Sequence, residues 1–101
     1  MVYQMVNRNE LTTTEKQVEE QILDAVKAER RNQDQKWGIN WNLPDYAFYA
    51  ILGEEFGEVG KAINERDLAN LKEELIQVAA VAVRHLTALE IKTDTQRRKL
   101  D

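Results

Sequence analysis

Cysteine is absent from the sequence, and histidine occurs only once, at His85. A chain without cysteine forms no disulfide and no zinc site with thiolate ligands, and it has no thiol nucleophile. A single histidine excludes every site within the chain that requires two imidazoles. Any chemistry must therefore depend on carboxylates, amides, hydroxyls, and basic or aromatic side chains.

Residues that break helices are also scarce, since the 101 residues include one proline and four glycines. Hydrophobic residues make up 43% and charged residues 32%, a balance typical of a globular protein. The longest uninterrupted apolar run, Val78 to Val83, is far shorter than the roughly 20 residues that span a bilayer. We therefore expect a globular protein with no membrane partner.

Two further absences concern location and partners. The segment MVYQMVNRNE lacks the basic and then apolar pattern of a secretory signal, so we expect a cytoplasmic protein. The net charge of −4 argues against a nucleic-acid partner, because binding to a phosphate backbone requires an excess of clustered basic residues.

Hydrophobic periodicity predicts three helices and no strand. The first runs from about Thr13 to Lys36, the second from about Pro44 to Asn64, and the third from about Leu68 to Ile91. Thr14 is the expected N-cap of the first helix, Pro44 the expected first residue of the second, and Asp67 the expected N-cap of the third. The pattern predicts an all-α protein, an antiparallel helix bundle with short loops.

The helices divide the chain into an N-terminal arm (1–12), a helical domain (13–91) and a polar C-terminal tail or short helix (92–101). The third predicted helix has a second apolar stripe, formed by Ile76, Ala80 and Val83, beside its main one. A helix that is apolar on two sides is buried on two sides. Because a chain of this length buries only a small core, we expect the second stripe to contact a partner chain in a homodimer or homotetramer.

Acidic residues inside the second and third predicted helices are the most informative feature. They are Glu54, Glu55 and Glu58 on the second helix, and Glu73 and Glu74 on the third, followed by Gln77. Residues three apart on a helix are neighbours, so Glu55 pairs with Glu58 and Glu74 with Gln77. A solvated acidic face is the simplest interpretation. Against it, neither Glu55 nor Glu74 has a basic residue one turn away on its own helix.

Carboxylates that converge from two antiparallel helices provide the oxygen ligands that a hard divalent cation requires. Mg²⁺ commonly takes one or two protein carboxylates, and substrate phosphates and waters supply the remaining oxygens. The arrangement therefore indicates Mg²⁺, with Mn²⁺ as an alternative, and a substrate that carries phosphates.

The motifs EEFGEV (54–59) and EELIQ (73–77) resemble those of the MazG-like, all-α nucleoside triphosphate pyrophosphohydrolases. The segments ERRNQDQKWG (29–38) and QVAAVAV (77–83) resemble the small phage- and mobile-element-type members of that family. The resemblance implies an enzyme on this helical fold. It would hydrolyse a nucleoside triphosphate to the monophosphate and pyrophosphate with Mg²⁺, often as sanitation of the nucleotide pool.

The resemblance also assigns roles to single residues. Glu55, Glu58 and Glu74 match metal ligands of the family, and Gln77 occupies the position of the fourth ligand, where the family has an aspartate. Gln77 offers a neutral oxygen without charge. A non-catalytic nucleotide-binding protein and a plain helical assembly protein therefore stay open as alternatives to the enzyme.

Three further assignments are less specific. The general base would be Glu54 or Glu73, both next to an expected ligand. Lys36 and Trp37 suit a phosphate charge and a stacked base, although Trp37 can also cover the core. His85 is expected to lie in the core or an interface and not to act in catalysis.

Overall fold

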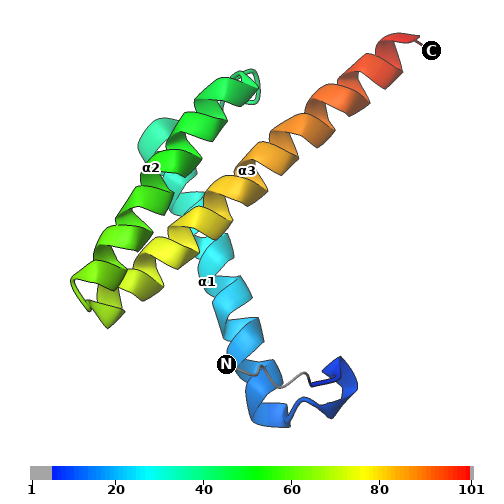
Figure 1. The fold of residues 1–101 in the computed structure, drawn as a ribbon. Helices are drawn as coiled ribbons and strands as arrows, with labels where there is room; N and C mark the ends of the chain where they lie inside the picture. The colour runs from blue at the N-terminus through cyan, green and yellow to red at the C-terminus, as the bar shows by residue number, and fades with distance from the viewer. Residues whose placement is uncertain (1–5, 101) are drawn as a thin grey trace.

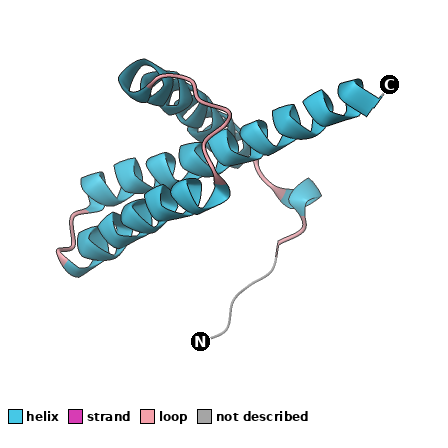
Figure 2. Cartoon of the chain, turned by 90° about the horizontal axis from the view of Figure 1, so that it is seen from above, coloured by secondary structure: helices cyan, strands magenta, loops and turns pink. Residues whose placement is uncertain are grey.

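The computed structural model describes the backbone of residues 6–100 and the side chains of residues 6–94. It contains a short 3₁₀ helix, η1 (Arg8–Glu10), and three α-helices, α1 (Thr13–Trp37), α2 (Asp45–Asn64) and α3 (Leu68–Leu100) (Figure 1). No strand occurs in this part of the chain (Figure 2). The all-α prediction is confirmed, and the three helices lie within a few residues of their expected starts.

The first helix begins earlier than Thr14, the expected N-cap. Thr12 caps α1, and its hydroxyl oxygen accepts a hydrogen bond of 3.1 Å from the backbone N–H of Glu15. Glu15 lies three residues after Thr12, and a threonine and a glutamate at this spacing form a capping box. The residue three positions after Thr14 is Gln17. Pro44 is the N-cap of α2, one position before the place predicted for it.

The last helix begins as expected and ends later than expected. Asp67 accepts a hydrogen bond of 3.1 Å from the backbone N–H of Asn70, which caps α3. The helix passes the expected end near Ile91 and continues to Leu100. The segment 92–101 was expected to be a separate tail or short helix, but it contains no glycine or proline to end a helix. Lys92 also donates a hydrogen bond of 3.0 Å to the carbonyl of Leu43.

The third helix is central to the packing. It lies antiparallel beside α2, and α1 crosses it on another side (Figure 1). Buried apolar side chains come from all three helices: Val26, Phe48, Ala62, Ala80, Val81 and Ala88. The second stripe of α3 was expected to contact a partner chain. In this chain α1 covers part of that stripe: Ala80 is fully buried and Ile76 lines the groove between α1 and α3, whereas Val83 is 43% exposed, and the contact with a partner chain stays a prediction.

Many large apolar side chains of the described residues stay exposed. On α1 and the facing part of α3 they include Val18, Ile22, Leu23 and Leu75; elsewhere they include Tyr46, Tyr49, Phe56 and Leu86. A groove of about 450 Å³ lies between α1 and the first part of α3, and Val18, Ile22 and Leu75 are among its lining residues. Within the described residues, no helix is long and apolar enough to cross a membrane.

Candidate functional site

The carboxyl groups of Glu55 on α2 and Glu74 on α3 form the centre of the acidic cluster. Glu74 is only 9% exposed, and the Oε2 atoms of both residues are buried without a hydrogen-bond partner. Burial above all, and then the interaction with the carboxyl group of Glu74, raise the pKa of Glu55 to about 7. The antiparallel packing of α2 on α3 therefore places two carboxyl groups together, as the sequence predicted.

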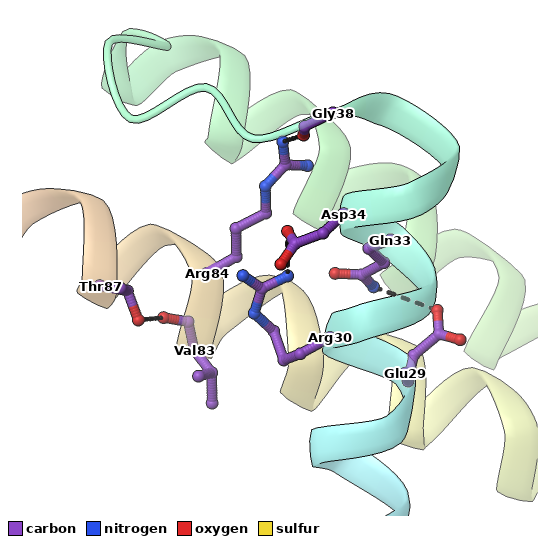
Figure 3. Close-up of polar contacts among 8 residues, drawn as sticks. All are labelled: Glu29, Arg30, Gln33, Asp34, Gly38, Val83, Arg84 and Thr87. Atoms are coloured by element: carbon purple, nitrogen blue, oxygen red, sulfur yellow. Dashed lines mark hydrogen bonds and ion pairs between the residues drawn. The ribbon is translucent and has the colours of Figure 1, made fainter.

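Two other carboxylates act on this pair. The negative charges of Glu58, on α2, and of Glu29, on α1, also raise the pKa of Glu55. Sequence reasoning did not identify Glu29 as part of the site. The amide of Gln33, one turn further along α1 and only 1% exposed, donates a hydrogen bond of 3.3 Å to Glu29 (Figure 3).

Four of the other predicted residues line one of two pockets, whereas Glu58 and Lys36 line neither. Gln77 and Glu73 line one pocket of about 450 Å³ between α1 and α3, here called the Gln77 pocket. Its other lining residues are Ala25, Ala28, Glu29, Asn32 and Ile76. Glu54 and Glu55 line a different pocket. Among the side chains that the structure describes, no three acidic or histidine groups are placed to hold one metal ion as they stand.

The second pocket has a volume of about 350 Å³ and is here called the Trp37 pocket. It is lined by Trp37, Asn40, Leu43, Ile51, Glu54, Glu55 and Arg84. The indole of Trp37 is 48% exposed, so it does not serve only to cover the core. The Nζ atom of Lys36 lies 5.2 Å from the centroid of the Trp37 ring, outside the pocket lining.

Arg84 is the second residue that sequence reasoning missed. Its side chain is 4% exposed, and one terminal nitrogen donates a hydrogen bond of 3.0 Å to the carbonyl of Gly38 (Figure 3). Gly38 ends α1 with a φ of 77°, a conformation that other residues rarely adopt, and this turn directs its carbonyl to Arg84. One signal was available: Arg84 is the only lysine or arginine between Glu73 and Glu90.

His85 has a structural environment, as its position in the helix predicted. Its ring is stacked on Phe48 with 4.5 Å between centroids, and its Nε2 atom lies 2.9 Å from Asp45 at the start of α2. The side chain ties the beginning of α2 to α3 and does not line either pocket.

Comparison of the chain with family models, with curated proteins and with solved structures finds no significant match. The acidic cluster and the two pockets are therefore the basis on which a function can be argued.

Proposed function

We propose that this protein is a Mg²⁺-dependent nucleoside triphosphate pyrophosphohydrolase of the MazG-like type, with a role in sanitation of the nucleotide pool. The observation that carries the proposal is the pairing of Glu55 with Glu74. Each has a buried oxygen without a partner, and the pKa of Glu55 is raised to about 7. Burying two neighbouring carboxyl groups without partners costs free energy, and such an arrangement suits a site that binds a cation.

The donor set fits a hard divalent cation in its chemistry. Glu55 and Glu74 would hold Mg²⁺ directly, with Glu58 joining by a change of its exposed side chain, because all three offer carboxylate oxygens. When bound, the ion would neutralise the polyphosphate and polarise the phosphorus that is attacked. Glu29 adds a negative charge from α1. Gln77, on α3, carries no charge.

Other residues of the chain would bind the base and accept a proton from the attacking water. Trp37 is half exposed and lines the pocket beside the acidic cluster, so a base can stack on its indole there. Glu54 lines the same pocket as Glu55, whereas Glu73 lines the Gln77 pocket. We therefore favour the carboxylate of Glu54 over that of Glu73 as the group that accepts a proton from the attacking water.

The direct test is an assay of pyrophosphate release from a panel of canonical and modified nucleoside triphosphates with Mg²⁺ and with Mn²⁺. We expect release that depends on the metal and is abolished by chelation. A panel in which no nucleotide yields pyrophosphate above the chelated control would contradict the enzymatic proposal.

A non-catalytic nucleotide-binding protein on the same fold is the second candidate. It is favoured by Gln77 and by the fact that no three acidic groups of the described side chains are poised around one point. Stabilisation of the protein against heat by nucleotide and Mg²⁺, without pyrophosphate release, would distinguish it from the enzyme. A helical assembly protein would show neither effect.

The substitution Gln77→Asp tests the missing charge. We expect it to tighten Mg²⁺ binding by about 1 kcal/mol, roughly fivefold, because a carboxylate attracts a divalent ion more strongly than an amide does. Calorimetric titration of Mg²⁺ into both proteins without nucleotide measures the change. Asn32→Asp is the matched control, since Asn32 lines the same pocket from α1. Equal gains from both variants would show that position 77 is not a ligand position.

Self-association is the last part of the proposal. Large apolar side chains on α1 and α3, among them Ile22 and Leu75, are about half exposed in a single chain, and contiguous apolar surface of this kind marks an interaction site. We expect sedimentation velocity at micromolar concentration to show a dimer or tetramer, and Ile22→Glu to shift it towards monomer. Gln21→Glu adds the same charge at the adjacent exposed position and should leave assembly intact. A wild-type protein that sediments as a folded monomer contradicts this expectation.

A further inference from the structure

Arg84 is a buried cation that no carboxylate among the described side chains neutralises. Within the described side chains, no Asp or Glu lies at ion-pair distance from its guanidinium group. Among the described residues, its guanidinium group donates a hydrogen bond to the carbonyl of Gly38, and its buried Nε–H has no partner. Because a buried charge is costly unless it is paired or fully hydrogen-bonded, this arrangement indicates an acceptor supplied by something other than the described chain.

The orientation of the guanidinium group is fixed by its neighbours. Its central carbon lies 6.0 Å from the centroid of the Trp37 ring and 5.9 Å from that of Phe48. Together with the hydrogen bond to Gly38, these contacts hold the planar group at the Trp37 pocket, which Arg84 itself lines. A donor held in this way is suited to recognition, since little conformational entropy is lost when a ligand binds.

The other walls of the pocket define the shape and polarity of the ligand. Trp37, Leu43 and Ile51 provide aromatic and aliphatic surface, while Asn40 and Glu54 provide acceptor oxygens. The Oδ1 atom of Asn40 is positioned by a hydrogen bond of 3.0 Å from the backbone N–H of Asn42. The carboxylates of Glu54 and Glu55 would repel a free phosphate. A flat, uncharged ring with both acceptors and donors on its edge fits better.

We propose that Arg84 is a specificity residue that selects nucleobases with a lactam edge, a carbonyl next to a ring N–H. The guanidinium donates to the carbonyl, and the Oδ1 atom of Asn40 accepts from the ring N–H. The favoured substrates are 6-oxopurine and 4-oxopyrimidine nucleoside triphosphates. Adenine and cytosine present an amino group at that position, and a guanidinium cannot accept a hydrogen bond from it. The inference rests on the proposed function, because it assigns the base-binding side of the same site.

Matched pairs of nucleotides test the selection in the wild-type protein. Inosine and adenosine triphosphates differ at the 6-position of the purine, and uridine and cytidine triphosphates differ at the 4-position of the pyrimidine. We expect the KM of the oxo member of each pair to be lower by about tenfold or more, as for other sites that lose a buried hydrogen bond. Equal KM values within both pairs, or a preference for the amino members, would overturn the inference.

Variants of Arg84 test the residue itself. Arg84→Met keeps much of the packing volume and removes the donors, so it should raise the KM of the oxo nucleotides about tenfold and leave those of the amino nucleotides unchanged. Arg84→Lys should retain part of the preference. Arg31→Met, at an exposed arginine of α1, is the control and should change nothing. A uniform loss across all four nucleotides would show that Arg84 only supports the fold.

The two proposals fail in different ways. If no nucleotide releases pyrophosphate, the enzymatic function is wrong, and calorimetric binding of the same four nucleotides then tests the pocket. A retained preference for the oxo members would support the assignment of Arg84 as a binding residue. Binding without preference, or no binding, would overturn it.

Discussion

The substitutions Glu55→Gln and Glu74→Gln are each expected to reduce pyrophosphate release by at least about 100-fold while leaving the protein folded. Both residues contribute a buried carboxylate oxygen without a partner to the seam between α2 and α3. An amide of the same shape preserves packing there but removes the charge that a divalent cation needs, and changes around metal sites commonly cost this much activity. Steady-state pyrophosphate release, with circular dichroism as a check on folding, measures the result.

The matched control is Glu90→Gln, at an exposed glutamate of α3. It removes one negative charge from the same helix and should retain full activity. The rate of pyrophosphate release by Glu58→Gln is expected to lie between those of Glu55→Gln and Glu90→Gln, because Glu58 is exposed and acts on Glu55 through its charge. Variants at positions 55 and 74 that keep activity but lose stability would show that the two carboxylates are structural.

Three helices and their order could be predicted because each helix repeats its apolar residues at helical spacing over several turns. Their ends were harder to predict. Thr12 and Thr14 are both acceptable caps in isolation, and the choice depends on Glu15. Nothing in the composition of residues 92–100 marks the end of a helix, and the contact of Lys92 with Leu43 depends on the packing of α2 on α3.

The pairing of Glu55 with Glu74 could be predicted since two antiparallel helices joined by a short turn must place their facing residues together. Glu29 and Arg84 could not be predicted in the same way. Glu29 reaches the cluster only because α1 crosses α3, and periodicity gives no crossing angle. The position of Arg84 depends on the turn at Gly38, 46 residues away along the chain.

The crossing of α1 covers part of the second apolar stripe of α3, whereas Val83 of that stripe is 43% exposed. Periodicity correctly indicated a helix buried on two sides, but it does not distinguish a covering helix of the same chain from one of a partner. Exposed apolar surface also lies on α1, around Ile22, and on the face of α3 that bears Leu75. We therefore expect self-association to involve the first helix as well as the third.

Metal-free protein is expected to become less stable as the pH rises from about 5 to about 8. The pKa of Glu55 rises from 4.5 to about 7 on folding, so between these values the folded state binds more protons than the unfolded state. Stability then decreases with rising pH through this window and levels off above it. The full shift corresponds to about 3 kcal/mol, which we reduce to about 1–2 kcal/mol because Glu55 is partly exposed to solvent.

Thermal unfolding of wild type and Glu55→Gln across this pH range isolates the effect. A loss of 1–2 kcal/mol corresponds to a decrease in Tm of about 5–10 °C for a chain of this size. Other groups titrate in the same range, so the decisive quantity is the difference between the two proteins. The Tm of Glu55→Gln should match that of wild type near pH 5 and exceed it near pH 8, while the Tm of Glu90→Gln should follow wild type throughout.

Excess Mg²⁺ at pH 8 should raise the Tm of wild type and not that of Glu55→Gln, because the cation replaces the proton only where the carboxylate pair is intact. Parallel curves for wild type and Glu55→Gln would mean that the carboxyl groups of Glu55 and Glu74 do not share a proton, and the argument for a cation between them would fail with it.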